Sequence, residues 1–416
     1  MQPDSDRIER VRRRMHASGL DALLCRLSHH VLLLTGYAPV LGNSFVLFPL
    51  EGDPVLLVPA CEEKMAHDGW VEDIRPYAST TLLQLGRVLE AVEPMLAQLA
   101  REKDLLGGTI GYEHDYGMVP ASYPEIEVTS PATVQLIQEA FGNADWKPAD
   151  RDLERLEAVL TEREVDMVRL ANMIAAEGMM AAKAVLRPRI RECDVAGEVS
   201  RAVMAAGLRL EPVRRVMAFP HVLSGPRTEE AYKPFALTSG REILRGDQVL
   251  VQLEVYLDGF WAEITRTFIL GRPSADQRAA YEACLAAMER ARQMERPNDH
   301  ASGVDISARS VLIERGYGSS FRHGLGHGVG FQAISHERLP RLHPASPDIL
   351  LPGMVHNMEP GIYYEHFGLR INDDVLVTEG APEQLTPLPS DLEWATCTRR
   401  RTISLPREVQ PERRTA

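Results

Sequence analysis

The sequence contains no hydrophobic run long enough to cross a membrane. The longest apolar stretches, such as Ala22–Cys25 and Val31–Thr35, are far shorter than the roughly 18 residues that a spanning helix needs. The first six residues are polar and acidic rather than apolar, which predicts that the chain has no signal peptide. Low-complexity tracts are also missing, and this excludes a disordered or collagen-like protein.

Positive charge and cysteine pairs are scarce as well. The formal net charge is −13, which disfavours nucleic acid as a partner, although a local basic patch stays compatible with this total. The five cysteines are odd in number and scattered without CxxC spacing, which is typical of reduced thiols rather than of a disulfide framework. We therefore predict a cytoplasmic protein that acts on a small molecule and has no membrane or nucleic-acid partner.

What is present is the composition of an ordinary globular chain with room for two domains. The chain has 416 residues, of which 44% are hydrophobic and 25% charged. A polar stretch with a proline at residues 145–150 precedes a strong helix start, because Thr161 and Glu164 have capping-box spacing. We therefore expect a first domain at residues 1–150 and a second at residues 151–416.

The two predicted domains differ in their patterns. The first alternates helical stretches with short apolar runs, which is typical of an α/β domain. The second predicts an α+β domain with helices on one face of an antiparallel sheet, and Asp258-Gly259 between two apolar runs is a strong hairpin signal. The strands predicted in the first domain are Ala22–Cys25, Val31–Thr35, Ser44–Phe48 and Pro54–Val58.

Histidines and carboxylates in the second domain are the best candidates for chemistry. His323 and His327 are separated by glycines, which leave the backbone room to approach a ligand closely. Glu263 and Glu359 lie in strand-like segments, where a carboxylate costs free energy unless it is paired, hydrogen-bonded or bound to metal.

These residues lie in blocks that resemble the pita-bread fold shared by methionine aminopeptidase, aminopeptidase P, prolidase and creatinase. Residues 10–37 also resemble the N-terminal domain of creatinase and prolidase. The resemblance implies a creatinase/prolidase-like first domain and a pita-bread catalytic second domain. The resembling blocks are residues 246–249 (GDQV), 258–268 (DGFWAEITRTF), 323–330 (HGLGHGVG), 352–355 (PGMV), 358–363 (MEPGIY) and 370–375 (RINDDV).

The resemblance implies that peptidases with this fold bind two divalent ions through five side chains, Asp, Asp, His, Glu and Glu. The corresponding residues of this sequence differ from that set. Only two of the four carboxylates remain, and neutral amides are weak ligands for hard cations. We therefore predict a degenerate site without metal; the alternative is one Mn, Co or Zn ion held by Glu263, His327 and Glu359. In this sequence the five positions fall on Gln252, Glu263, His327, Glu359 and Asn372.

The family's histidines are displaced too. Where the family has a proton-transferring or substrate-binding His after a Ser-Gly segment, this chain has Tyr232, and His221 is a candidate substitute. The family's second catalytic His falls on Ile334, so His336 takes that role only if the chain has a two-residue insertion or bulge. We predict that His327, Glu359, His336 and Glu263 are catalytic, and that the substrate is bound by His323, Tyr232, Gln252, Asn372, Arg370, His221 and Tyr363.

The main functional prediction is a creatinase-like hydrolase, or a related lyase. It would act on a C–N bond of a small, polar, nitrogen-containing substrate without a dinuclear metal centre. Buried carboxylates that lose a metal need another cation, such as an ammonium or guanidinium of the substrate. One alternative is a metal-dependent Xaa-Pro aminopeptidase or dipeptidase, and another is a non-catalytic binding protein. Because its closest resemblances are dimers, we expect a homodimer.

Overall fold

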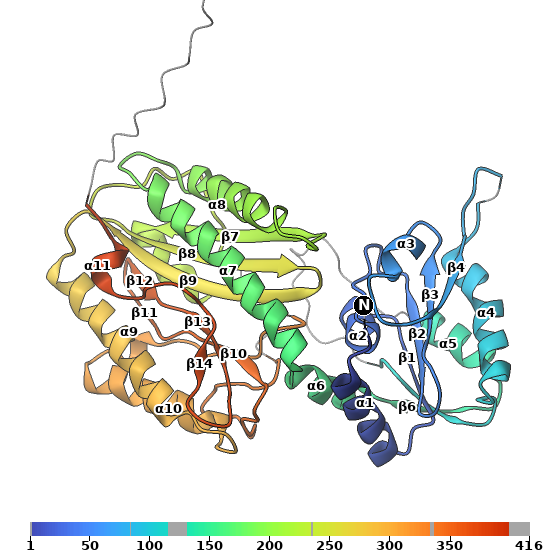
Figure 1. Ribbon diagram of the computed structural model, residues 1–416. Helices are drawn as coiled ribbons and strands as arrows, with labels where there is room; N and C mark the ends of the chain where they lie inside the picture. Colours follow the sequence, from blue (N-terminus) through green and yellow to red (C-terminus); the bar gives the residue numbers. More distant parts are fainter. Residues whose placement is uncertain (1, 84, 115–130, 234–235, 333–336, 399–416) are drawn as a thin grey trace, which may run out of the picture.

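The computed structural model describes residues 2–83, 85–114, 131–233, 236–332 and 337–398. Figure 1 shows two lobes joined near α6 (Asp150–Ala158) and the start of α7 (Glu162–Val185). In the described part of the chain, none of the helices combines the length and the apolar character that crossing a bilayer requires.

The N-terminal lobe is a six-stranded sheet in the order β4-β3-β2-β1-β5-β6 with helices on both faces. Its central strand β1 pairs antiparallel with β2 and parallel with β5. The strands are β1 (Ala22–Cys25), β2 (Phe45–Pro49), β3 (Val55–Pro59), β4 (Asp73–Tyr77), β5 (Thr109–Tyr112) and β6 (Asp145–Pro148), and the helices are α1 (Ser5–Ser18), α2 (Ser28–Thr35), α3 (Glu63–Ala66), α4 (Val88–Glu102) and α5 (Pro131–Ala140).

Alternation along the central strand divides the core of this lobe into two layers. Leu23 and Cys25 point to the layer beneath α1 and α2, whereas Ala22 and Leu24 point to the layer beneath α4 and α5. This period of two is what a strand covered on both faces requires. The predicted α/β class of the first domain is confirmed.

The predicted strand at Val31–Thr35 is wrong, because these residues form the second half of helix α2. All six residues from His30 to Thr35 are buried, so no polar face reveals the helical period. A short run that is apolar on every side cannot be assigned to strand or helix by periodicity. The helix ends at Gly36, whose φ of 69° suits glycine and whose N–H bonds to the carbonyl of Leu32 at 2.8 Å.

The C-terminal lobe is built on the long antiparallel hairpin of β8 (Gln248–Leu257) and β9 (Phe260–Leu270). Asp258 and Gly259 both have positive φ, 47° and 100°, as the Asp-Gly signal predicts for a tight turn. Strand β7 (Val216–Ser224) pairs with β8, and β15 (Thr396–Cys397) pairs with β9. Helices α7 and α8 (Glu192–Gly207) cover the apolar face of this sheet.

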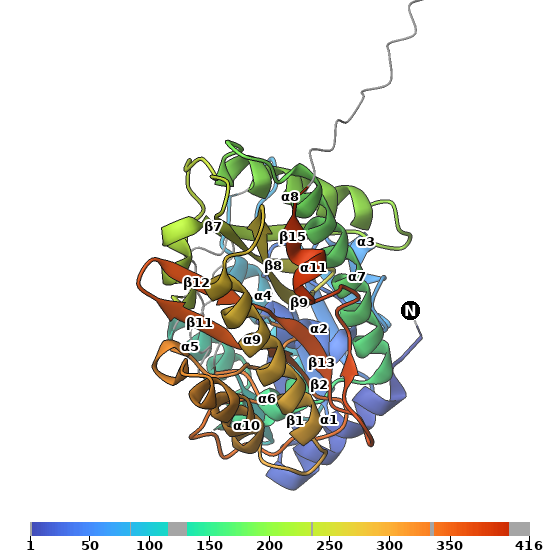
Figure 2. The same cartoon turned by 90° about the vertical axis from the view of Figure 1, so that its left-hand side faces the viewer.

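Short strands and a second helix pair complete the lobe on the other side. Figure 2 shows α9 (Ala275–Met294) and α10 (Ala301–Glu314) beside these strands, and their side chains share one buried cluster. The predicted α+β class of the second domain is confirmed. The remaining elements are β10 (Val355–Met358), β11 (Gly361–Tyr364), β12 (Phe367–Arg370), β13 (Asp373–Leu376), β14 (Glu383–Gln384), α11 (Leu392–Ala395) and two 3-10 turns at Gly225–Tyr232 and Gly318–Ser320.

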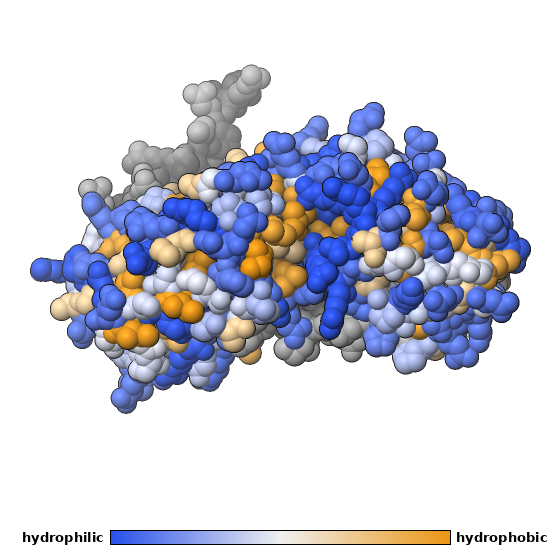
Figure 3. All heavy atoms as spheres, turned by 90° about the horizontal axis from the view of Figure 1, so that it is seen from below, coloured by the Kyte–Doolittle hydropathy of each residue, from blue (hydrophilic) through white to orange (hydrophobic). Residues whose placement is uncertain are grey.

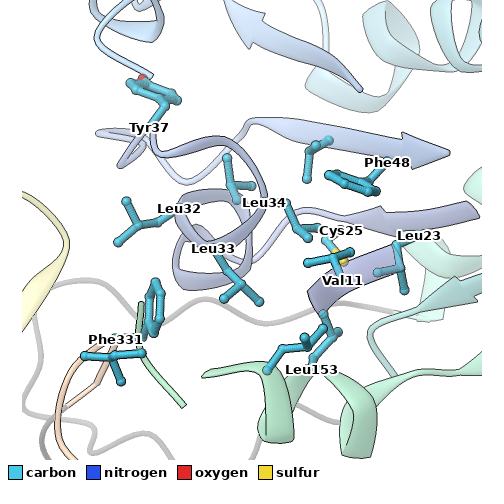
Figure 4. Close-up of a cluster of buried hydrophobic side chains, with 14 of the residues drawn as sticks. Val11, Leu23, Cys25, Leu32, Leu33, Leu34, Tyr37, Phe48, Leu153 and Phe331 are labelled. Atoms are coloured by element: carbon cyan, nitrogen blue, oxygen red, sulfur yellow. The ribbon is translucent and has the colours of Figure 1, made fainter. Parts of the chain in front are cut away.

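The two lobes are packed on one continuous core. Val11, Leu23 and Leu33 of the first lobe belong to the same buried cluster as Leu153 and Phe331 (Figure 4). Burial of apolar area at about 25 cal/mol per Å² makes such a shared core a stable junction. Seen from below, Figure 3 shows hydrophilic side chains beside apolar ones across the middle of the molecule. Arginines of α1 and α6 line a cavity of about 1180 Å³.

Candidate active site

The inner face of the β8–β9 hairpin carries three acidic or amide side chains. Glu254 pairs with Glu263 across the two strands, and Gln252 lies two residues before Glu254, on the same face. The Nε2 of Gln252 is 2.5 Å from Glu254 Oε1 and 3.4 Å from Glu263 Oε1. Both glutamates are buried, so they sit where charge is poorly solvated.

His327 is fixed opposite this face by its own backbone and by Asn357. The Oδ1 of Asn357 accepts the N–H of His327 at 2.7 Å, and a Cβ at Gly326 would come within 2.0 Å of the Asn357 carbonyl, so only glycine fits there. The ring Nδ1 lies 3.1 Å from the carbonyl of Gly328, which can only accept, so Nδ1 carries the proton. The Nε2 lone pair accepts from the Asn357 amide at 3.2 Å and faces Glu263 Oε2 at 3.5 Å.

Glu359 lies on the other side of the site with Arg370. Arg370 Nη1 is 3.2 Å from Glu359 Oε2, and the same guanidinium donates a short hydrogen bond to the Oε1 of Gln252. Both side chains are buried, so their charges are weakly screened. Arg370 is therefore a resident cation among Gln252, Glu359 and the two glutamates of the hairpin.

Several buried polar atoms of the site have no hydrogen-bond partner among the described residues. They are Glu263 Oε2, Glu254 Oε2, Thr265 Oγ1 and both amide atoms of Asn372. Burial raises the pKa of Glu263 well above its usual range, and the nearby Glu359 and Glu254 raise it further. Buried polar atoms without partners cost free energy, so their concentration here marks a place for a ligand.

These residues offer a metal ion a limited number of ligands. Glu263 Oε2 and His327 Nε2 face each other at 3.5 Å, and a cation bound between them would stabilise the ionised form of the Glu263 carboxyl. Glu359 is a third donor, at present engaged by Arg370. With neutral Gln252 and Asn372 at the other two positions, the donor set fits one divalent ion and does not fit a pair.

The aromatic residues and histidines that we predict to bind substrate lie beside these carboxylates. The Nε2 of His323 is 3.0 Å from the hydroxyl of Tyr363, and the ring of Tyr232 lies 5.8 Å from that of Tyr363. His221 is on β7 directly opposite Gln252, with its Nε2 3.5 Å from Glu254 Oε2. His336 lies outside the described residues, so its predicted role stays a prediction.

Glu254 is the site residue that sequence reasoning missed. It matches no ligand position of the family blocks, and its neighbours in the chain are apolar. The signal was nevertheless present in the strand period, because Glu254 is two residues after Gln252 and its cross-strand partner in the Asp-Gly hairpin is Glu263. Burial raises the pKa of Glu254, whereas the neighbouring His221 lowers it.

Comparison with known proteins defines the class of protein to which this fold and site belong. The model of metallopeptidase family M24 matches residues 166–379, and that of the creatinase/prolidase N-terminal domain matches residues 7–159. The chain therefore belongs to metallopeptidase family M24, and the predicted resemblance and the prediction of a hydrolase are confirmed.

Individual relatives are similar over 58% to 93% of the chain. An Xaa-Pro dipeptidase of Pyrococcus furiosus is 28% identical over 391 residues, which cover 93% of this chain and 99% of the relative. A probable dipeptidase of Mycobacterium tuberculosis is 34% identical over 242 residues, covering 58% and 61%. Among solved structures, the prolidase of Pyrococcus horikoshii OT3 has a TM-score of 0.74 and 26% identity over 93% of this chain and all of its own.

These comparisons contradict two predictions. The metal-free, creatinase-like hydrolase or lyase is wrong as the main function, because the relatives are named dipeptidases and Xaa-Pro dipeptidases. The absence of a cofactor is wrong as well, because the matching family is one of metallopeptidases. The error arose from weighing the missing carboxylates at Gln252 and Asn372 without the third buried glutamate, Glu254, whose charge offsets one of them.

Proposed function

We propose that the protein is a metal-dependent Xaa-Pro peptidase that uses one divalent ion. The observation that carries this proposal is the pair of donors Glu263 Oε2 and His327 Nε2, which face each other at 3.5 Å in a buried site. Support for the substrate comes from relatives named Xaa-Pro dipeptidase that match 93% of the chain.

The charges of the site support one ion rather than two. Glu254, Glu263 and Glu359 supply three negative charges when ionised, and Arg370 supplies one positive charge. One divalent ion then brings the cluster to neutrality, whereas a second would leave two uncompensated positive charges in a buried place. We therefore propose Mn, Co or Zn, bound through Glu263, His327 and Glu359.

The chain's own residues would divide the remaining tasks. A divalent ion bound here supplies Lewis-acid polarisation of the scissile carbonyl. Arg370 Nη1 lies 3.2 Å from Glu359 Oε2 and would orient this carboxylate, which we propose moves a proton during hydrolysis. His323, hydrogen-bonded to Tyr363 at 3.0 Å, would position the substrate, as would His221 beside Glu254.

The test combines metal content with hydrolysis. Protein stripped with a chelator should regain hydrolysis of Xaa-Pro dipeptides with Mn²⁺, Co²⁺ or Zn²⁺, and Glu263→Gln should abolish the recovery. Glu393→Gln, on an exposed helix end, is the matched control. Uptake of metal without hydrolysis of any Xaa-Pro dipeptide would overturn the substrate assignment. Full hydrolysis by metal-free protein would overturn the metal assignment.

We also propose that the protein is a homodimer. Leu82, Leu83 and Leu85 form an apolar tip between β4 and α4 whose side chains are almost entirely exposed, and a second chain would cover them. Analytical ultracentrifugation of the wild type against a Leu82→Ser/Leu83→Ser variant would test this.

The proposed location and domain boundary rest on separate observations. We propose a cytoplasmic location, which is supported by five cysteines that are all free. We also propose a domain boundary between residues 150 and 151, which is supported by the start of α6 at Asp150.

A further inference from the structure

A second cluster of metal-binding side chains lies between the two lobes, apart from the candidate active site. His29 and His30 belong to α2, Glu113 follows β5, and Glu157 belongs to α6. We call these four residues the junction cluster. His30, Glu113 and Glu157 are buried and His29 is half-buried, although none of the four belongs to the site described above.

Three ligand atoms of the junction cluster lie at the spacing of a single coordination sphere. Glu157 Oε1 is 3.5 Å from His30 Nε2 and 3.7 Å from His29 Nε2, and the three atoms all lie within 4.8 Å of one another. Ligands at the roughly 2.0–2.2 Å bond lengths of Zn²⁺ in a tetrahedral site are about 3.4 Å apart. The two distances to Glu157 Oε1 are therefore close to the value expected around a zinc ion, and the third separation is within 4.8 Å.

The surroundings of the Glu157 carboxylate indicate a ligand-binding position. It is 7% exposed, and its Oε1 has no hydrogen-bond partner in the part of the chain that the structure describes. Its other oxygen is 3.1 Å from Nη1 of Arg338. The unpaired oxygen is thus the one that points between the two imidazoles.

Glu113 orients His30 as a supporting residue does in a zinc site. Its two oxygens accept the backbone N–H groups of Leu27 at 2.9 Å and Arg26 at 3.0 Å, and Oε1 also lies 2.7 Å from His30 Nδ1. An ionised carboxylate only accepts, so Nδ1 donates and Nε2 is left to bind metal. Cys25, His30 and Glu113 form another possible group of metal ligands. In that group, however, His30 Nδ1 and Glu113 Oε1 are already hydrogen-bonded to each other.

The remaining coordination position is accessible to a ligand. A cavity of about 540 Å³ adjoins the cluster and is lined by His29, His30, His114 and Glu154, among others. Two histidines, one carboxylate and an open position form a donor set typical of Zn²⁺.

We propose that His29, His30 and Glu157 form a zinc site at the junction of the two lobes, supported by Glu113 and separate from the metal site of the M24 family. Zinc there would link α2 of the first lobe to α6, whose Glu157 also contacts Arg338 beyond the active-site histidines. The site would therefore fasten α2 to α6, at the surface of the first lobe that Arg338 of the second lobe contacts.

The experiment is zinc titration of the metal-stripped full-length chain by calorimetry, in a His327→Ala background that disables the active-site ligand set. We expect about one zinc ion per chain, and loss of this binding, by at least 100-fold in affinity, in Glu157→Gln and in His29→Asn. His114→Asn is the matched control, since His114 lines the same cavity but offers no ligand atom to the trio. Mg²⁺ should not bind, because it prefers oxygen ligands.

Cobalt substitution gives a second measurement that does not depend on activity. The visible absorption of a four-coordinate Co²⁺ site should appear in the His327→Ala chain and disappear with Glu157→Gln. If Glu157→Gln fails to fold, Glu113→Gln serves instead and should weaken zinc binding about 10- to 100-fold. Equal zinc binding and equal Co²⁺ spectra in the parent and in these variants would overturn the proposal, whatever the outcome for Xaa-Pro hydrolysis.

Discussion

The candidate active site and the junction cluster are both buried groups of histidines and glutamates with an arginine beside one carboxylate, yet they differ in where the unpaired atoms lie. In the active site, Arg370 lies among Glu254, Glu263 and Glu359, so the protein supplies one cation of its own. In the junction cluster, Arg338 contacts one oxygen of Glu157, and the other, which faces two histidines, has no hydrogen-bond partner among the described residues. In both groups the atoms proposed to bind metal are distinguished by where their unpaired oxygens point, which the types of residue alone do not give.

The largest effect is expected from substitutions of the proposed metal ligands in the active site. Glu263→Gln or His327→Ala should lower kcat/KM for an Xaa-Pro dipeptide by at least about 100-fold, because losing a ligand removes roughly 3 kcal/mol of transition-state stabilisation. Steady-state kinetics with saturating metal would measure this, with circular dichroism as a check of the fold. Activity within threefold of the wild type in both variants would contradict the assigned ligands.

The next effect concerns the number of ions. The double substitution Gln252→Asp and Asn372→Glu should raise the metal content from one ion to two per chain. Without metal it should lower the free energy of unfolding by about 1–3 kcal/mol, because each added carboxylate repels the three already present. Elemental analysis and urea unfolding in chelator would measure both. A metal content that stays at one ion would mean that these two positions do not face the ion.

A smaller effect is expected from Glu254, the carboxylate that no family position predicts. Glu254→Gln should weaken metal binding about tenfold, because it removes one of the three negative charges while keeping the size of the side chain. Its effect on kcat at saturating metal should be smaller than its effect on metal affinity. Isothermal titration with Mn²⁺ would separate the two, and Glu254→Asp is the control that keeps the charge. An unchanged affinity in Glu254→Gln would show that Glu254 serves only to hold Gln252 and His221.

The smallest effect is expected from a substitution of Arg338, beside the junction cluster. Arg338→Gln removes a cation that lies 3.1 Å from Glu157 Oε2, so zinc binding to the junction cluster should tighten about three- to tenfold. Zinc titration of this variant in the His327→Ala background measures the change. Weaker binding would indicate instead that Arg338 holds Glu157 in the orientation that the zinc needs.

Several features could be predicted from the sequence because they depend on neighbours in the chain. The Asp258-Gly259 turn needs two residues with positive φ, and Asp-Gly is a pair that tolerates them. The capping box of α7 likewise needs only Thr161 and Glu164 at the right spacing, and the N–H of Thr161 bonds to the Glu164 carboxylate at 2.8 Å. The family blocks located Glu263, His327 and Glu359, which the fold does bring into one buried site.

Other features depended on the tertiary structure for a physical reason. Whether Val31–Thr35 forms helix or strand is decided by packing on every side, which leaves no amphipathic period to read. Glu254 becomes part of the active site only because the pairing register sets it opposite Glu263. His30 and Glu157 are 127 residues apart in the numbering, and their ligand atoms come to 3.5 Å from each other because α2 and α6 share one buried core. The sequence by itself determined which chemical groups are available and the local turns and caps, because these follow from short-range geometry. The tertiary structure decided which of those groups meet, because long-range burial sets their directions and their charges.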